Sequence, residues 1–281
     1  MITDQGQRVA AHWSRLAVTV DGALAFLKDR GIAPDRVQAE DLHAVDMIHM
    51  GGVAATDKLA AMAGITAGQH VRDVGSGVGG PARRLASRFG ADVCGIELSE
   101  VLHGTGEALT RLVRLAGSVH HVHGSALSLP FGDATFDAVV MQHVAMQITE
   151  KDPLFAELAR VVRPGGCLAL HELFSGEGEI HYPLPWATEP SMSSLEPVEA
   201  CADRLARLGF AVGPFVDESE EGRRFHAANI AAYERALAAD QGAHGLSVDA
   251  TKARLAASVA MEHNLASGSV RVGMLVARRV A

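Results

Sequence analysis

The chain has 281 residues, 48% of them hydrophobic, which is ample for one core of ordinary size and marginal for two. Its 25 basic and 33 acidic residues give a net charge of -8, which disfavours nucleic acid as a partner because phosphate backbones are held by excess positive charge. The three cysteines, Cys94, Cys167 and Cys201, are too scattered for a disulfide framework or a zinc site, so they indicate buried thiols.

The first 67 residues contain helical patterns and no targeting signal. The opening segment MITDQGQRVAAHW lacks a basic head followed by an apolar stretch, and no apolar run approaches the ~20 residues that span a bilayer. Helical patterns at 22–30 and 56–62 are joined by a polar link that contains Pro34. We therefore expect a cytoplasmic protein, with no membrane as a partner, whose residues 1–67 form an N-terminal helical lid.

Strand patterns alternate with helical ones in the middle third of the chain. The strand candidates begin near Val71, Val93, Val119, Phe136 and Cys167. Helical stretches lie between them, at 81–88, 107–115 and 154–161. This alternation predicts a doubly wound parallel sheet with crossover helices over about 68–175.

The last third is less regular. Residues 176–197 are rich in Pro, Gly and aromatic side chains, and we expect them to form a lid. A helix near 198–208, a strand-like run at 210–216, helices at 222–240 and 248–266 and a strand at 270–276 follow.

A glycine-rich turn is the strongest local signal. The run Val71–Gly80 reads VRDVGSGVGG, a strand that breaks into glycines, and Pro81 then suits the first turn of a helix. Glycines at these positions let the backbone turn sharply and approach a ligand closely, with helix amides directed at it. We expect a nucleotide-like cofactor there.

The glycine-rich turn alone does not determine which cofactor binds. Gly75, Gly77 and Gly80 also satisfy the G-x-G-x-x-G dinucleotide pattern, and Glu97 is placed to bind ribose hydroxyls in either case. A purely structural turn is a third alternative. Asp73 favours a ligand with a cationic amino-acid end, such as S-adenosylmethionine (SAM), because a carboxylate would repel the pyrophosphate of a dinucleotide.

Five elements in order resemble the class I SAM-dependent methyltransferases. They are DVGSGVGG after the first strand, Glu97 in CGIELS, GSALSLP at 124–130, FDAVVMQH at 136–143 and VRPGGCL at 162–168. DMIHMGG at 46–52 and PLPW at 183–186 are similar to the subgroup of sarcosine/dimethylglycine and tocopherol or sterol methyltransferases.

The resemblance implies an α/β fold, a Rossmann-like seven-stranded doubly wound sheet with helical lid insertions. Residues 68–175 would be the SAM-binding core, 176–197 a lid and substrate loop, and 198–281 the C-terminal part of the core with a helical insertion. Arg72 departs from the Leu usual beside the motif Asp, and we expect it at an exposed or edge position.

The resemblance also assigns the cofactor residues. Asp73, Gly75 and Gly77 would hold the methionine part of SAM, and Glu97 would accept hydrogen bonds from both ribose hydroxyls. The other implied cofactor residues are Ser76 and Gly79 in the turn, Leu98 and Leu127 on the two faces of the adenine, Ser125 and Ala126 at its edge, Gln142 at the methionine carboxylate, and His49 and Gly51 over the sulfonium.

Two residues are candidates for catalysis. His143 ends the fourth strand, beside the expected methyl donor, and an imidazole can act as a base at neutral pH; alternatively it only binds SAM or shapes the pocket. Glu172, at the end of the fifth strand, would bind an amine or take a proton, or would be a structural carboxylate that caps a loop. Met50, Met146 and Trp186 are expected to contact the substrate.

Two other clusters suggest no further site. In HHVH, at 120–123, alternate side chains of a strand face opposite ways and no carboxylate or thiol follows at ligand spacing, so we expect no metal. The acidic run 217–221 precedes a helical pattern, where negative charge is favourable, and we expect a solvated helix start.

Three functions follow from these residues. The leading one is SAM-dependent methylation of a small molecule at nitrogen or oxygen, with C-methylation of an isoprenoid or aromatic substrate as the alternative. An isoprenoid diphosphate would call for basic residues in the lid, and 176–200 contains none. The other two are an NAD(P)-dependent oxidoreductase and a non-catalytic SAM-binding protein. The oligomeric state is left open, a homodimer being one option.

Overall fold

The computed structural model describes residues 4–16, 18–243 and 246–280, and it is built on one eight-stranded sheet. The strand order is β3-β2-β1-β4-β5-β8-β6, with β7 beside β8. Strands β1 to β5 are parallel, whereas β8 runs antiparallel to β5, β6 and β7. The strands are β1 His70–Val74, β2 Asp92–Glu97, β3 Val119–His123, β4 Phe136–Gln142, β5 Val162–Ser175, β6 Phe210–Val212, β7 Val216–Asp217 and β8 Val270–Arg279.

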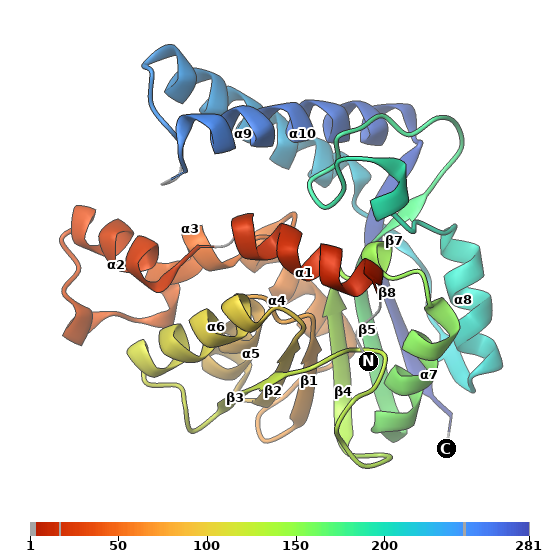
Figure 1. Cartoon of the computed structure of the whole chain (residues 1–281). Helices are drawn as coiled ribbons and strands as arrows, with labels where there is room; N and C mark the ends of the chain where they lie inside the picture. Colours follow the sequence, from red (N-terminus) through yellow and green to blue (C-terminus); the bar gives the residue numbers. More distant parts are fainter. Residues whose placement is uncertain (1–3, 17, 244–245, 281) are drawn as a thin grey trace.

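Helices cover both faces of the sheet and the carboxyl ends of its parallel strands (Figure 1). The helices of the sheet layers are α4 Gly52–Ala63, α5 Gly80–Phe89, α6 Glu100–Leu112, α7 Lys151–Val161 and α8 Val198–Arg207. The others are α1 Asp4–Leu16, α2 Val20–Asp29, α3 His43–Asp46, α9 Ser219–Ala238 and α10 Val248–Ser267, with short 3-10 turns η1 Pro34–Arg36, η2 Ala39–Leu42, η3 Ala145–Gln147 and η4 Pro190–Met192.

The central strands are apolar on both faces because helices pack on both. On one face, Val139 of β4 and Leu168 of β5 pack with Leu158 of α7. On the other, Val140 of β4 packs with Leu59 of α4. Near-continuous apolar runs are typical of buried parallel strands, which is why the strand predictions from Val71 to Cys167 are correct.

The sheet has eight strands because the run predicted at 210–216 divides into β6 and β7. Gly213 and Pro214 interrupt it: the Gly213 amide donates to the Val276 carbonyl at 2.9 Å, and Pro214 has no amide hydrogen for a ladder. Helix boundaries also shift. The helix expected from residue 107 begins at Glu100, where the Ser99 side chain accepts a hydrogen bond from the Leu102 amide.

Arg72 is buried, so its prediction as an exposed or edge residue was wrong. Its side chain is 0% exposed and reaches from β1 over the neighbouring strands. The guanidinium lies 3.9 Å from the Phe131 ring centroid and donates to Cys94 Sγ at 2.8 Å. Stacking on an aromatic face offsets part of the cost of burying this cation, and burial lowers the pKa of Arg72 to about 10.

Helices α9 and α10 form an antiparallel pair at the top of Figure 1, above α1 and the carboxyl ends of the strands. They interrupt the sheet between β7 and β8, which is the insertion expected within 198–281. Among the described helices, none combines the length and the apolar character needed to cross a membrane.

Candidate active site

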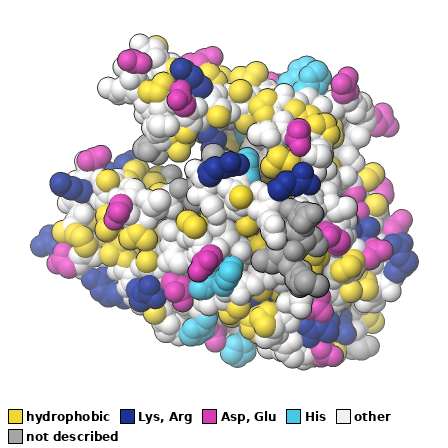
Figure 2. Space-filling model, viewed as in Figure 1, with side chains coloured by type: hydrophobic (Ala, Val, Ile, Leu, Met, Phe, Trp, Pro, Cys, Tyr) yellow, Lys and Arg dark blue, Asp and Glu magenta, His cyan; other side chains and the backbone are white. Residues whose placement is uncertain are grey.

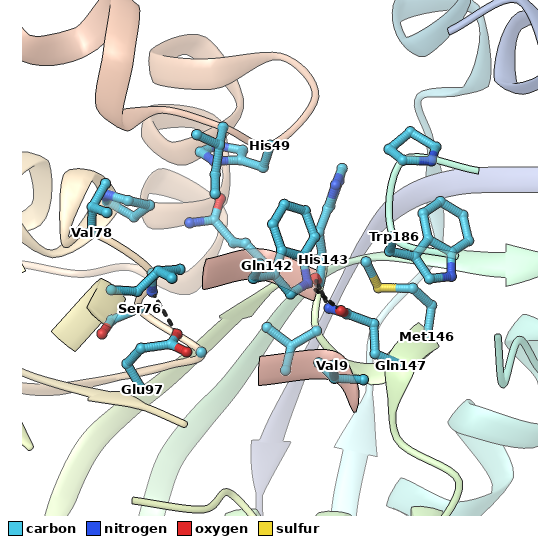
Figure 3. Close-up of a pocket in the computed structure, with 18 of the residues that line it drawn as sticks. Val9, His49, Ser76, Val78, Glu97, Gln142, His143, Met146, Gln147 and Trp186 are labelled. Atoms are coloured by element: carbon cyan, nitrogen blue, oxygen red, sulfur yellow. Dashed lines mark hydrogen bonds between the residues drawn. The ribbon is translucent and has the colours of Figure 1, made fainter. Parts of the chain in front are cut away.

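A cavity of about 600 Å³ lies at the carboxyl ends of β1, β2 and β4, between the sheet and the helices α1, α9 and α10. Figure 2 shows this face hollowed between the lobe of α9 and α10 and the body below it, with Lys and Arg side chains beside the hollow. In Figure 3, Ser76, Val78 and Glu97 lie on one side of the cavity, Met146 and Trp186 on the other, and Gln142 and His143 between them.

The glycine turn after β1 forms the floor of one half. Gly75 and Gly77 have φ angles of 69° and 54°, and a Cβ on Gly75 would come within 2.4 Å of Val144 Cγ2. Asp73, at 2% exposure, lines the cavity beside this turn with its Oδ2 atom lacking a hydrogen-bond partner. Burial raises the pKa of Asp73 to about 7, so a cation bound here would stabilise its ionised form.

Glu97 joins the glycine turn to the end of β2. Its Oε2 accepts from the Gly77 amide at 3.0 Å and its Oε1 from the Ser99 amide at 2.8 Å. Burial raises the pKa of Glu97 despite these hydrogen bonds. Each carboxylate oxygen has two lone pairs, so acceptor sites remain for hydroxyls of a ligand in the cavity.

The residues expected around the adenine line the same half of the cavity. They are Leu98, Ser125, Ala126 and Leu127. Ser125 Oγ accepts from the Leu127 amide at 3.2 Å, which fixes the turn, and the hydroxyl hydrogen remains a donor.

Gln142 ends β4 at the boundary between the two halves. Thr56 Oγ1 donates to Gln142 Oε1 at 3.3 Å, and the same hydroxyl lies 3.1 Å from His49 Nε2. Gln142 Nε2 is enclosed and has no partner. This leaves an amide donor for an acceptor atom on a ligand, as the sequence predicts for the methionine carboxylate.

His143 follows Gln142 and lines the cavity. Its backbone is left-handed, with φ of 57°, and its amide donates to the His171 carbonyl at 2.9 Å. Burial, assisted by His171, His49 and His226, lowers the pKa of His143 well below its ordinary value. The imidazole is therefore neutral at pH 7, and its Nε2 has no hydrogen-bond partner.

His49 and His171 lie beside His143, and the Lys58–Glu218 ion pair contacts His171. The ring centroids of His143 and His171 lie 4.8 Å apart, and His49 is about equally far from both, at 6.0 and 6.1 Å. Glu218 Oε2 lies 3.4 Å from His171 Nε2, while its Oε1 is 2.6 Å from Lys58 Nζ. Glu218 is buried, so the expectation of a solvated acidic run at 217–221 was wrong at this residue.

Glu172 lies behind the cavity wall. Its carboxylate accepts from the Val144 amide at 2.9 Å and from the Ala145 amide at 3.1 Å. Burial raises the pKa of Glu172 to about 7. Glu172 is not among the described residues that line the cavity, and this position matches the alternative of a carboxylate that caps a loop rather than one that contacts substrate.

The second half of the cavity is apolar. Met50, Met146 and Trp186, which the sequence predicts at the substrate, all line it and are buried. Trp13 of α1 also lines it and donates from Nε1 to Gln147 Oε1. Gln147 Nε2 in turn donates to the His143 carbonyl at 3.3 Å, so α1 is tied to the turn that carries His143.

Two predicted cofactor residues cap helices instead of lining the cavity. Gly51 precedes α4 with φ of 76°, and Gly79 precedes α5 with φ of 82°. A Cβ on Gly79 would come within 2.6 Å of His121, so this glycine permits close packing. His121 itself lies 2.9 Å from Thr110 Oγ1, and no group of three potential metal ligands occurs among the described residues.

Sequence reasoning missed the cavity residues of α9 and α10. They are Phe225, His226, Asn229 and Tyr233 on α9, and Arg254, Ala257 and Ser258 on α10. Their spacings of three, four and seven residues define one face of each helix, a pattern that was present in the sequence. The helices themselves were predicted, but which face meets the cavity depends on tertiary packing.

The residues around the first half fit SAM. Asp73 has a carboxylate oxygen without a partner, Glu97 keeps free acceptor sites, and Gln142 has an unpartnered amide donor, which are the groups that an ammonium, ribose hydroxyls and a carboxylate would need. The turn after β1 leads directly into α5, whose second residue, Pro81, lines the same cavity.

Comparison with known sequences also matches this chain to methyltransferases. A family model described as a methyltransferase domain matches residues 72–170. The chain is 34% identical to the sterol 24-C-methyltransferase of Eremothecium gossypii over 57% of this chain and 44% of that protein. It is 30% identical to the O-methyltransferase resE of Aspergillus sclerotiorum over 63% of this chain and 68% of that protein. The match thus spans less than half the length of the sterol enzyme.

A solved structure of similar fold covers nearly the whole chain. The geranyl diphosphate C-methyltransferase of Streptomyces coelicolor A3(2) superposes with a TM-score of 0.69 and 20% identity, over 99% of this chain and 98% of that one. The likeness extends to both the sheet and the helices that cover it.

Proposed function

The chain belongs to the class I SAM-dependent methyltransferases, and from that premise we propose that it transfers the methyl group of SAM to an oxygen of a largely apolar small molecule, with His143 accepting the proton. The observation that carries the proposal is the position of His143. A neutral imidazole lines the cavity where the half that fits SAM meets the apolar half.

The first half would hold the cofactor through residues of β1, β2 and β4. Asp73, Glu97 and Gln142 bind the ammonium, the ribose and the carboxylate in this proposal, as the resemblance implies. SAM supplies a methyl group on a positively charged sulfonium, which a nucleophile displaces in line. The chain therefore has to align the acceptor and keep the site dry.

The second half would receive the acceptor. Trp13, Met146 and Trp186 give it large apolar walls, which exclude water and favour an apolar body on the substrate. The α1 helix closes one side through Trp13 and Gln147. An acceptor in this half lies next to both His143 and the expected position of the methyl group.

A hydroxyl acceptor makes the best use of His143. A hydroxyl must lose its proton as the oxygen takes the methyl group, and a positioned base contributes typically 10²–10⁴-fold to such a step. A neutral amine nitrogen attacks through its free lone pair and needs no base at that moment. Of the two relatives described above, the one that the chain covers over more of its length, 68%, is an O-methyltransferase.

C-methylation of an alkene is the second candidate. The sterol 24-C-methyltransferase relative favours it, and so does an aromatic wall, because a cation formed on carbon would be stabilised by aromatic faces. In that reaction His143 would accept the proton that the methylated carbon skeleton loses. Both candidates therefore give His143 the same role with different acceptor atoms.

The test supplies the purified protein with SAM carrying a ¹³C methyl group and with panels of apolar alcohols, phenols, amines and terpenoid alkenes. The chemical shift of the transferred carbon distinguishes O-, N- and C-methyl products. We expect an O-methyl product, and loss of its formation in His143→Ala. Calorimetric titration with SAM and with NADH runs beside it: no saturable SAM binding contradicts the proposal, and SAM binding without any product favours the non-catalytic alternative.

A further inference from the structure

The far end of the cavity, between α9 and α10, carries polar groups that the methyl transfer does not use. Tyr233 and Arg254 line the cavity together with Asn229 and Ser258. Among the described residues that line it, Arg254 is the only lysine or arginine. A lysine or arginine that lines the cavity away from the residues that fit SAM indicates that an acidic or polar group of a ligand is recognised there.

His226 provides a second, independent observation. Its side chain is 4% exposed and lines the cavity, yet neither ring nitrogen has a hydrogen-bond partner. Burial lowers the pKa of His226 to about 4, so the neutral ring offers one donor and one acceptor. Buried polar groups are ordinarily satisfied, and an unsatisfied one at a cavity wall is explained by a polar ligand.

These residues lie in a row that leads away from His143. His226 is close enough to His143 to lower the pKa of that imidazole. One turn further along α9 comes Asn229, and Tyr233 lies about 10 Å beyond His226 at the rise of an α-helix. Helices α9 and α10 pack against each other, and Tyr233 of α9 and Arg254 of α10 interact electrostatically.

We propose that this end of the cavity is a carboxylate subsite, in which Arg254 binds a carboxylate of the substrate and His226 and Asn229 contact the polar groups between it and the methyl acceptor. This inference rests on the proposed function, since it deepens the substrate class of the same cavity. It predicts a substrate that carries a carboxylate at one end, the methyl acceptor at the other and at least one polar group between them.

A carboxylate fits better than a phosphate. Arg254 supplies one positive charge and a planar fork of donors, which matches a carboxylate in charge and in bidentate geometry. A phosphate monoester carries up to two charges at neutral pH, and the second would stay without a lysine or arginine among the described lining residues. Burial lowers the pKa of Arg254 and raises that of Tyr233.

The test uses three probes of one chain length: octanoate, octan-1-ol and octyl phosphate. Octanoate spans the distance along α9 when extended. The protein is first saturated with S-adenosylhomocysteine, so that the cofactor half is filled without turnover. Tryptophan fluorescence reports binding, because the chain has two tryptophans, Trp13 and Trp186, and both line the cavity. We expect octanoate to bind at least roughly tenfold more tightly than octan-1-ol and more tightly than octyl phosphate.

Variants on one helix localise the effect. Arg254→Gln should bring octanoate to within about twofold of octan-1-ol, and Arg254→Lys should keep part of the preference because it keeps the charge without the planar fork. Lys252→Gln is the matched control, since it removes the same charge from an exposed position of α10. If Arg254→Gln no longer binds S-adenosylhomocysteine, the preference for octanoate over octan-1-ol is compared between Arg254→Lys and the unmutated protein instead.

The outcomes separate this inference from the proposed function. Equal affinity for octanoate and octan-1-ol, no octanoate binding, or a preference that survives in Arg254→Gln would overturn the subsite, while S-adenosylhomocysteine binding leaves the methyltransferase proposal standing. Tighter binding of octyl phosphate than of octanoate would overturn the choice of carboxylate. Failure of the unmutated protein to bind S-adenosylhomocysteine would instead contradict the proposed function.

Discussion

Glu172 holds the turn that carries His143. Its carboxylate accepts the amides of the two residues that follow His143, at 2.9 and 3.1 Å, while the His143 amide donates to the carbonyl of the residue before Glu172. His143 has a φ of 57°, a conformation that costs a residue with a side chain of order 1–3 kcal/mol. Strand β5 thus maintains the backbone that directs the candidate base into the cavity.

Removing the Glu172 carboxylate should impair turnover more than cofactor binding. Glu172→Ala leaves the Val144 and Ala145 amides without an acceptor, which we expect to lower the free energy of unfolding by about 1–3 kcal/mol. The turn would relax and misdirect His143, so kcat should fall while the SAM dissociation constant changes by less than about threefold. Chemical denaturation, steady-state kinetics and calorimetry measure the three quantities.

Glu172→Gln separates positioning from general stability. The amide keeps one acceptor oxygen of the same shape, so we expect it to restore most of kcat, and Glu179→Gln at an exposed position should change nothing. A loss of kcat in Glu172→Gln as large as in Glu172→Ala, without loss of stability, would indicate instead that the carboxylate takes part in proton transfer.

His143→Ala should lower kcat by roughly 10²–10⁴ if the imidazole accepts the substrate proton. SAM affinity should change little, because the cofactor contacts proposed for Asp73, Glu97 and Gln142 remain. His143→Gln is the control for size and hydrogen bonding, and it should be as inactive as the alanine variant. Parallel losses in kcat and in SAM affinity would make His143 a binding residue.

The sequence predicts the sheet well because its signals are local. The strands β1, β2, β4 and β5 and the helices between them occur in the predicted order, although α6 begins seven residues and β5 five residues earlier than predicted. The predictions that were wrong concern single residues whose environment is set by distant packing. Arg72 is buried through stacking on Phe131, and Glu218 is buried through Lys58 and His171, which are 160 and 47 positions away in the sequence.

In the candidate site, too, local sequence signals predict one part and distant packing determines the other. The cofactor half follows from motifs that are contiguous in the chain, so Asp73, Glu97 and Gln142 were placed correctly at the cavity; their contacts with SAM remain a prediction. The acceptor half combines α1 with α9 and α10, and no local pattern brings Trp13 beside Gln147 or Arg254 beside Tyr233. The proposed substrate class therefore depends on contacts that only the assembled structure brings together.

Glu97→Ala should weaken SAM binding by about 1–3 kcal/mol, the usual cost of losing a charged hydrogen-bonding partner. The variant loses the proposed ribose acceptor and also frees the Gly77 and Ser99 amides, which loosens the glycine turn. Glu100→Ala, three residues on and exposed, is the matched control and should bind SAM normally. Unchanged affinity in Glu97→Ala, measured by calorimetry, would refute the cofactor position.

Binding of SAM should strengthen as the pH rises from 6 to 8, because Asp73 attracts the cationic cofactor only when ionised. Burial raises the pKa of Asp73 to about 7 in the free protein, so at pH 6 most of the carboxyl is protonated and affinity should be roughly tenfold lower than at pH 8. The bound cation lowers the pKa of Asp73, so binding near pH 7 should release a proton, which calorimetry in buffers of different ionisation enthalpy detects.

Burial lowers the pKa of His49 to about 4 and that of His171 to about 3, so neither titrates in this window. Burial also raises the pKa of Glu97, and Asp73→Asn separates the two carboxyls. That variant should bind SAM weakly at every pH, and a pH dependence that persists in it would assign the effect to Glu97 or to Glu172, whose pKa burial raises to about 7.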